Sequence, residues 1–279
     1  MYTINCKGKI IKLVDPLVMG ILNVTPDSFY RPVPFSGIDG IVETARQMLA
    51  DGADIIDIGG QSTRPGSKRI SAKEEMLRVI PAVEAIQVKF PGIIISIDTF
   101  YSDVAVAAVD AGASIVNDIS AGNMDKSMLS AVAGLKVPFI CVHMKGEPST
   151  MQREPHYENV VREVLDYFIA KTDECRQAGI TDLIIDPGFG FGKTIAHNFS
   201  LLKNLGVFSI TGKPILAGLS RKSTIYKTLG VEAADALNGT TVLNSLALAN
   251  GASILRVHDV KEAKEAIRLF SAYKKAPQN

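Results

Sequence analysis

Short apolar runs of strand length recur along the chain and are separated by longer stretches. Eight of these runs are rich in Ile and Val and lack a regular alternation of polar and apolar residues: residues 17–24, 54–60, 93–99, 114–120, 139–144, 183–188, 214–220 and 253–259. Continuous apolar runs are typical of parallel strands that are covered on both faces. Each gap between two runs is long enough for a crossover helix. The pattern therefore predicts eight strand–helix units.

Periodicity and capping signals predict helices between these strands. One apolar face has i, i+3, i+4 spacing and consists of Tyr157, Val160, Val161, Val164, Leu165 and Phe168. Ser71 with Glu74 predicts a capping box at the start of the second helix. Asp259 with Glu262 predicts another before the last helix. Pro81 lies inside the second helix and predicts either a kink or an early end.

A weak internal repeat precedes several of the predicted strands. Gly-Ala-Asp-Ile at 52–55 resembles Gly-Ala-Ser-Ile at 112–115 and at 251–254, with a looser copy at 179–182. A glycine just past a helix end supplies the left-handed conformation that ends the helix. We therefore expect the same short turn before each of these strands, on an end of the fold with a structural role.

The other ends of the strands finish in polar or charged residues: Asn23, Gln61-Ser62-Thr63-Arg64, Asp98, Asn117-Asp118, His143, Asp186, Ser220-Arg221-Lys222 and Arg256-Val257-His258. Any strand that leaves a core becomes polar, but this explanation fits Asp98, Asp186 and Arg256 poorly. These three lie within or directly after apolar runs, where a charge is costly unless it is paired or functional. In a (β/α)8 barrel, this end carries the active site.

These patterns predict one domain, residues 1–279, folded as an α/β (β/α)8 TIM barrel with a short N-terminal β-hairpin-like extension. The alternative is a doubly wound open sheet, which needs no eighth strand and usually has a glycine-rich first turn. Here that turn reads NVTPDSF, which favours the barrel. The GFGFGKT run is not a phosphate loop, because Pro187 stands where the first glycine of that motif is required.

Composition limits the classes of partner. Thirty Lys and Arg against 29 Asp and Glu give a net charge of +1, which offers no broad basic surface for nucleic acid or an anionic membrane. The three cysteines are far apart and form no C-x-x-C pair, so neither a disulfide framework nor a zinc site is indicated. Neither a signal-peptide pattern nor a membrane-spanning run is present. We expect a cytoplasmic protein.

Several motifs occur in a fixed order along the chain: ILNVTPDSF, DIGGQSTRPGS, SIDTF, NDISAG, DPGFGFGKT, GLSRKS and RVHDV. Together they resemble the dihydropteroate synthase family, a pterin-binding TIM-barrel family, from Met19 to His258. The resemblance implies a sulfonamide-target transferase of folate biosynthesis. Its reaction joins 6-hydroxymethyl-7,8-dihydropterin diphosphate to p-aminobenzoate and gives 7,8-dihydropteroate and diphosphate. Carbon–oxygen cleavage leaves a ring cation and a diphosphate anion, so this chemistry needs a carboxylate near the first and cations near the second.

The resemblance also implies roles for individual residues. The pterin would be held by Asp98, Asn117, Asp186 and Lys222, with the Arg256 guanidinium on its face. The diphosphate would meet Thr63, Arg64, Asn23, Arg256 and His258, with Mg2+ bound by phosphate oxygens and Asn23. p-Aminobenzoate would lie near Pro65, Phe191, Lys222 and Ser223, where a helix should begin. Asp98, Lys222 and Arg256 would be the catalytic residues, and the family implies a homodimer.

Most of these residues also have ordinary structural interpretations. Asp98 is a possible helix cap and Asp186 an Asp-Pro turn. Asn23 alone reads as a turn residue, and His258 as a core or capping histidine. Phe191 alone is as consistent with loop packing as with a ring contact. The strand-end positions favour ligand contact for the two aspartates.

The chain departs from the family pattern at two places, and two rival functions remain. Pro32 and Pro34 stiffen the first loop, and Gln61 stands where many family members carry Glu. A methyltetrahydrofolate–corrinoid methyltransferase would use the same barrel, but it binds no diphosphate, so the cationic residues at the strand ends argue against it. A pterin-binding protein without catalysis is the second rival. Turnover with both substrates separates all three.

Overall fold

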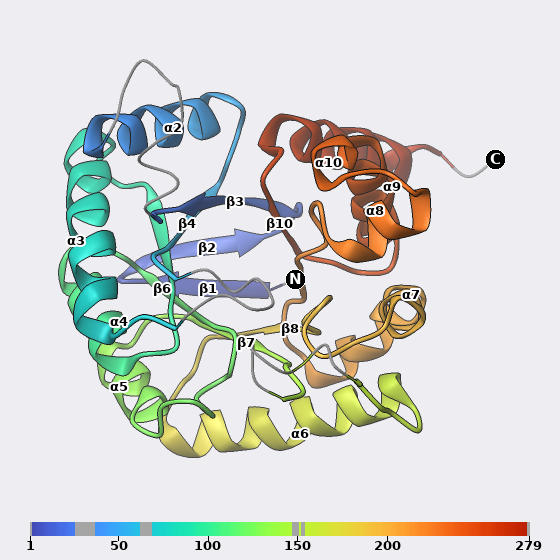
Figure 1. Cartoon of the computed structure of the whole chain (residues 1–279), viewed down its shortest axis with the longest axis horizontal. Helices are drawn as coiled ribbons and strands as arrows, with labels where there is room; N and C mark the ends of the chain where they lie inside the picture. The colour runs from blue at the N-terminus through green and yellow to red at the C-terminus, as the bar shows by residue number, and fades with distance from the viewer. Residues whose placement is uncertain (1, 26–36, 62–68, 147–150, 152–153, 278–279) are drawn as a thin grey trace.

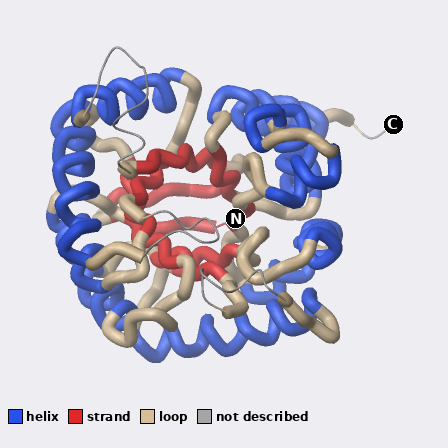
Figure 2. The backbone as a smooth tube through the Cα atoms, in the orientation of Figure 1, coloured by secondary structure: helices blue, strands red, loops and turns tan. Residues whose placement is uncertain are grey.

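Eight parallel strands form one sheet that helices surround (Figure 2). The computed structural model describes residues 2–25, 37–61, 69–146, 151 and 154–277. The strands are β3 (Leu17–Asn23), β4 (Ile55–Gly59), β5 (Ile94–Asp98), β6 (Ile115–Asp118), β7 (Phe139–Val142), β8 (Leu183–Asp186), β9 (Leu216–Ala217) and β10 (Ile254–Val257). Each lies within one of the eight predicted apolar runs, which confirms the strand prediction.

The strand order shows a barrel. Neighbouring strands follow the order β8-β7-β6-β5-β4-β3-β10-β9, and all of these pairs are parallel. A parallel bridge between Ile185 and Ile215 then joins the two outer strands, β8 and β9. The (β/α)8 prediction is confirmed, and the doubly wound alternative is wrong.

The helices follow one another around the barrel, each packed on the next along the chain (Figure 1). They are α2 (Ile38–Ala50), α3 (Ala72–Lys89), α4 (Ser102–Asp110), α5 (Met128–Leu135), α6 (Val160–Ala178), α7 (Ile195–Lys203), α8 (Ser223–Leu229), α9 (Leu237–Ala249) and α10 (Val260–Lys275), with 3-10 turns η1 (Leu205–Thr211) and η2 (Ala233–Asp235). Helix α3 continues through Pro81, so the prediction that the helix ends early at this residue was wrong. Pro81 and Leu77 are exposed, where water can satisfy the carbonyl that proline leaves unpaired.

The two predicted capping boxes have different outcomes. Half of the first box forms: the Ser71 hydroxyl accepts a hydrogen bond from the backbone N–H of Glu74 at the start of α3, whereas the Glu74 carboxylate accepts from Arg78 instead of the Ser71 N–H. Asp259 does precede α10, but its carboxylate accepts two hydrogen bonds from Arg221, at 2.8 and 2.9 Å. The second capping box was therefore wrong, because an ion pair to the neighbouring loop is the stronger partner.

The repeated glycine turn is the same structure at each site. Gly52, Gly112 and Gly251 have φ angles of 100°, 126° and 99°. In every copy the N–H of the following alanine donates to the carbonyl five residues earlier, at 2.9 Å, which is the bond that closes a helix before a left-handed residue. Each turn leads from a helix into the next strand, which confirms the prediction.

The apolar interior of the barrel is sealed at the end where the strands begin. Strands β1 (Tyr2–Cys6) and β2 (Lys9–Leu13) form an antiparallel hairpin. Its buried side chains Ile4, Cys6 and Leu13 pack against the first inward-facing residues of the barrel strands. A second, larger apolar cluster fills the space between barrel and helices. The predicted N-terminal extension is thus a hydrophobic plug at the end opposite the polar strand ends.

Two further sequence expectations concern the membrane and the cysteines. None of the helices in the described residues is both long and apolar enough to cross a membrane. Cys6, Cys141 and Cys175 are free and buried. A buried free thiol behaves as a small apolar side chain, so the cysteines contribute to packing.

We predict that Ile4→Ala lowers the free energy of unfolding by about 2 to 5 kcal/mol, because Ile4 is 1% exposed and its truncation leaves a cavity in the plug. Denaturant titration measures this loss. Ile10→Ala on the same hairpin is the control: Ile10 is 57% exposed, so its loss should stay below about 0.5 kcal/mol. Equal losses for the two variants would show that the hairpin is not a plug.

Candidate active site

A polar layer replaces the apolar barrel interior near the carboxyl ends of the strands. Ile55, Ile94, Ile115, Ile184 and Ile254 belong to the cluster inside the barrel. Side chains alternate along a strand, so residues two or four positions further on face the same interior. Those positions hold Asp57, Asp98, Asn117, Asp186 and Arg256. The strands thus bring into one layer residues that lie far apart in the sequence.

Arg256 joins two carboxylates across the barrel. Its Nε donates to Asp57 Oδ2 at 2.6 Å, and its Nη2 donates to Asp98 Oδ2 at 2.6 Å. Asn117 Nδ2 also donates to Asp57 Oδ2, at 3.1 Å. Asp57 is fully buried, and the guanidinium is largely buried. These contacts fix the planes of Arg256 and Asn117 within the barrel mouth.

Burial and charge act against each other in this group. Burial raises the pKa of Asp98; Arg256 opposes the rise, and the Asp57 carboxylate adds to it. Burial alone would lower the pKa of Arg256, but Asp57 and Asp98 outweigh it and the net direction is upward. Two carboxylates therefore share one guanidinium, which leaves Asp98 with unneutralised negative charge or a readily held proton.

Asp186 and Lys222 both approach Gly218, next to Arg256. A methyl group added at Gly218 would lie 3.7 Å from both Asp186 Oδ2 and Lys222 Nζ, and 4.0 Å from Arg256 Cβ. Asp186 Oδ1 accepts a hydrogen bond from the N–H of Gly188 at 2.8 Å, so the Asp-Pro turn is real as well. The turn uses one carboxylate oxygen, and the other faces Gly218.

Lys222 precedes α8 and reaches back over the loop that follows β8. Its Nζ donates to the carbonyl of Phe189 and lies 4.8 Å from the centre of the Phe191 ring. Burial lowers the pKa of Lys222 to about 8, against the opposing attraction of Asp186. Burial also raises the pKa of Asp186, against Lys222. The expected helix start at Ser223 is confirmed.

The predicted diphosphate residues are placed only in part. Asn23 ends β3 and is exposed at the mouth. His258 follows β10, with its Nδ1 3.0 Å from the hydroxyl of Ser220, which links it to the loop after β9. The remaining predicted contacts, Thr63, Arg64 and Pro65, lie outside the described residues, as do Pro32 and Pro34 of the first loop. Gln61 Oε1 accepts a hydrogen bond from the N–H of Ile70 at 3.0 Å, a bond that a glutamate can also accept.

Sequence reasoning missed Asp57. It lies inside the Ile-rich run DIIDIGG, so the criterion that selected Asp98 and Asp186, a charge within an apolar strand, applies to it equally. The other acid of that run, Asp54, pairs with Lys264 at the amino end of the barrel. Only the alternation of side chains along β4 separates the two: Asp57 shares the inward face with Ile55.

The layer offers hydrogen-bond acceptors and an excess of carboxylates. Within the described part of the chain, the buried oxygens Asp57 Oδ1 and Asn117 Oδ1 have no hydrogen-bond partner. Buried acceptors without partners are costly, which favours a ligand that donates hydrogen bonds there. Asp57, Asp98 and Asp186 face two cations, Arg256 and Lys222. The site therefore suits a polar ring that donates N–H groups and gains positive charge.

Comparison with known proteins agrees with this chemistry. The family of pterin binding enzymes matches residues 19–258. The chain is 44% identical over 275 residues to the dihydropteroate synthase of Escherichia coli K12, covering 98% of this chain and 97% of that one.

Solved structures of such enzymes share the fold. The Yersinia pestis dihydropteroate synthase in a sulfonamide drug complex has a TM-score of 0.93 at 39% identity, covering 99% of this chain and all of that one. The Xanthomonas albilineans enzyme with 4-aminobenzoic acid has a TM-score of 0.92 at 40% identity and 99% coverage of both chains. The same enzyme in complex with 7,8-dihydropteroate has a TM-score of 0.88 at 38% identity, over 99% of this chain and all of that one. This chain therefore belongs to the pterin binding enzyme family and, within it, to the dihydropteroate synthases.

Proposed function

We propose that this chain condenses 6-hydroxymethyl-7,8-dihydropterin diphosphate with p-aminobenzoate to 7,8-dihydropteroate and diphosphate in folate biosynthesis. The observation that carries the proposal is the buried group of Asp57, Asp98 and Arg256, with the acceptor oxygen of Asn117 beside it. Family membership supports the same reaction. Relatives have been solved with 4-aminobenzoic acid and with 7,8-dihydropteroate, one substrate and the product of this reaction.

The pterin would occupy the polar layer. Its N–H groups would donate to Asn117 Oδ1 and to Asp186 Oδ2, and the Arg256 guanidinium would lie against the ring face. Cleavage of the methylene carbon–oxygen bond sends the electron pair to diphosphate and leaves positive charge on the ring. Asp98, already poorly neutralised by Arg256, would stabilise that charge because it is fixed in place before the reaction begins.

The diphosphate would lie above the ring, near Asn23, His258 and the predicted contacts Thr63 and Arg64. Among the described residues no three His, Cys, Asp or Glu side chains form a metal cluster. One exposed amide oxygen, that of Asn23, suits Mg2+ that arrives mainly on phosphate oxygens. Bound there, Mg2+ would neutralise charge on the leaving diphosphate.

p-Aminobenzoate would approach from the side of Phe191, Lys222 and Ser223, with Pro65 as a further predicted contact. Its amine is uncharged at neutral pH and attacks the methylene carbon directly. The released proton can leave with diphosphate, so no side chain has to act as a base. Lys222 bridges the two halves of the site, because it lies beside Asp186 on one side and the Phe191 ring on the other. Positioning should dominate this step.

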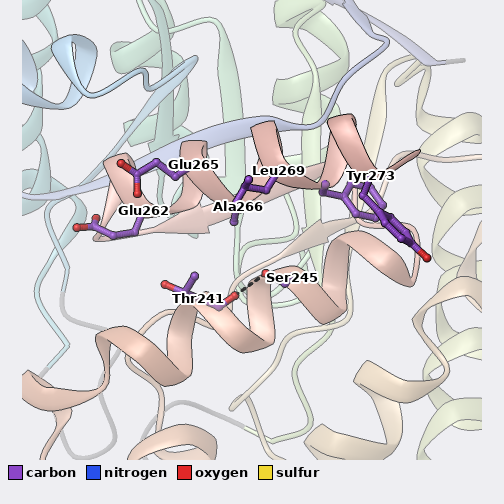
Figure 3. Close-up of a pocket in the computed structure, with 8 residues that line it drawn as sticks. Thr241, Ser245, Glu262, Glu265, Ala266, Leu269 and Tyr273 are labelled. Carbon is purple, nitrogen blue, oxygen red and sulfur yellow. Dashed lines mark hydrogen bonds between the residues drawn. The ribbon is translucent and has the colours of Figure 1, made fainter. Parts of the chain in front are cut away.

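We further propose that two copies of the chain associate through α9 and α10. Exposed apolar side chains gather there: Val242 and Leu246 on α9, Leu269 and Tyr273 on α10. A cavity of about 370 Å3 lies between the helices, lined by residues of both (Figure 3). Clustered exposed apolar side chains are typical of a subunit interface. Sedimentation velocity at micromolar concentration tests the dimer.

Free buried thiols support a cytoplasmic location.

The first prediction of the proposed function is that purified protein releases diphosphate only with both substrates present. In addition, Asp98→Asn should lower turnover roughly 10²- to 10³-fold and weaken pterin binding far less. The amide keeps the shape of Asp98 and loses the charge that opposes the ring cation. Steady-state rates and calorimetric affinities give the two effects.

Asp54→Asn is the matched control, because Asp54 pairs with Lys264 at the far end of the barrel. Its turnover should equal that of the unmodified protein. If Asp98→Asn reduced affinity and turnover by the same factor, Asp98 would be a binding residue only.

The second prediction concerns pH. Lys222 lies between the pterin side and the p-aminobenzoate side of the site, and it carries its positive charge only in the ammonium form, whose pKa burial lowers to about 8. kcat/KM should therefore fall as pH rises through about 8, since the charged form is lost above its pKa. In Lys222→Arg this alkaline limb should disappear whatever the absolute rate, because arginine stays charged. The same limb in both proteins would assign it to another group.

The third prediction is that pterin diphosphate binds more tightly with Mg2+, whereas the pterin lacking diphosphate is indifferent to it. Isothermal titration with and without chelator measures the difference. Asn23→Ala should reduce the Mg2+ effect and leave binding in chelator unchanged. Tight binding of Mg2+ to the protein without ligand would contradict a metal carried by the substrate.

A further inference from the structure

Lys193, in the GFGFGKT run, is a buried cation to which the proposed reaction gives no direct role. The residue is 3% exposed. Its Nζ lies within hydrogen-bond distance of four acceptors: Gly188 O at 3.0 Å, Phe191 O at 3.0 Å, His143 O at 3.2 Å and His143 Nδ1 at 2.9 Å. Burial lowers the pKa of Lys193, and Asp186 opposes that effect. Four acceptors converge on the three N–H donors of an ammonium, so at least two of the acceptors share one donor.

The same contact defines the state of His143. An ammonium can only donate, so with Lys193 charged, His143 Nδ1 accepts and the neutral ring carries its proton on Nε2. Burial lowers the pKa of His143 to about 2, and the Lys193 charge adds to the effect. His143 is therefore fixed in one tautomer, with its ring packed edge-on against Tyr167.

Lys193 lies where two loops press against each other. A methyl group added at Gly188 would stand 1.9 Å from His143 O, and one at Gly192 would stand 2.2 Å from Lys145 O. Both glycines have positive φ, 69° and 64°. The loop after β7 thus packs its carbonyls directly against the glycines of the loop after β8, and carbonyls of both loops, His143 O and Gly188 O, converge on Lys193 Nζ.

The loop that Lys193 holds carries groups on both sides of the site. The N–H of Gly188 donates to Asp186 Oδ1, and the carbonyl of Phe189 accepts from Lys222. The next aromatic residue, Phe191, lies beside Lys222. Lys193 binds the carbonyls of Gly188 and Phe191. The Phe189 carbonyl that accepts from Lys222 lies between these two along the chain.

We propose that Lys193 is a positioning residue for the arylamine half of the reaction. It clamps the loop after β8 to the loop after β7, with neutral His143 as an obligatory acceptor, and so sets Lys222 and the Phe191 ring at the p-aminobenzoate site. It touches neither substrate. This inference rests on the proposed function.

The test compares Lys193→Met with Lys171→Met. Lys171 is a second buried lysine, 5% exposed, whose Nζ binds Asn123 and Glu174 at the outer helix α6. Removing the Lys193 clamp should lower kcat/KM for p-aminobenzoate by about 10²-fold, since displacement of a reacting pair by about 1 Å has that effect. The calorimetric affinity for pterin diphosphate should fall by a much smaller factor, because Asp98, Asn117 and Asp186 are held by their own strands and only the Lys222 contact depends on the clamp. Lys171→Met should lose stability and keep both kinetic constants.

Histidine nitrogen NMR supplies a readout that does not depend on turnover. In the unmodified protein, His143 should show the Nε2–H tautomer and stay neutral at pH values where a free histidine, with a pKa of about 6.5, is protonated. In Lys193→Met the Nδ1 resonance should move, because its donor is gone. In Lys171→Met it should not. If the unmodified protein made no dihydropteroate but this signature held, the proposed function would fail and the clamp would stand.

A milder variant covers the case in which Lys193→Met does not fold. His143→Leu removes one acceptor and leaves the three carbonyls, so it should raise KM for p-aminobenzoate by a smaller factor. Either variant with KM for p-aminobenzoate unchanged and only stability reduced would overturn the positioning role. So would a loss of pterin affinity as large as the loss of kcat/KM.

Discussion

The shared guanidinium of Arg256 is the interaction on which the carboxyl end of this barrel depends. Arg256, the third residue of β10, is largely buried. Its charge is tolerated there only because Asp57 on β4 and Asp98 on β5 each present a carboxylate. The same contacts orient Asn117 through Asp57. Breaking one partner would leave an unpaired buried charge, which typically costs several kcal/mol. The site is therefore rigid where the pterin would bind, and the barrel strands themselves provide that rigidity.

The two ends of the barrel solve different physical problems. At the amino end, glycine turns close the helices and the hairpin covers the apolar interior. At the carboxyl end, Asp57 Oδ1 and Asn117 Oδ1 stay buried without a partner among the described residues. Functional sites often keep such destabilising groups in the free protein, and a bound ligand then restores the lost stability. The plug and the turns provide that stability from a distance.

Periodicity predicted much of this fold, for a physical reason. Parallel strands buried on both faces require unbroken apolar runs. All eight strands could therefore be located from such runs in the sequence, β9 included although it is only two residues long. Contacts between distant elements were harder to predict. The sequence around Asp259 predicts a capping box, but Arg221 lies beside its carboxylate. Pro81 predicts a kink or an early end of α3, but its side of the helix faces water and the helix continues. Asp57 was overlooked because a run without alternation does not show which residues face inward.

Charge balance also explains why the lysines near the site differ. Three carboxylates against Arg256 and Lys222 favour a ligand that becomes positive, yet a diphosphate requires cations at the same mouth. The structure separates the two sets of residues by depth: the Asp57–Arg256–Asp98 group lies within the barrel, while the proposed diphosphate contacts Asn23 and His258 lie exposed at its rim. Lys222 stands between the two levels, where its lowered pKa reflects burial and the attraction of Asp186 opposes it. Lys193, buried in the loop after β8, is engaged by three carbonyls and His143 Nδ1, so its charge holds the two loops together while that of Lys222 remains available to a substrate.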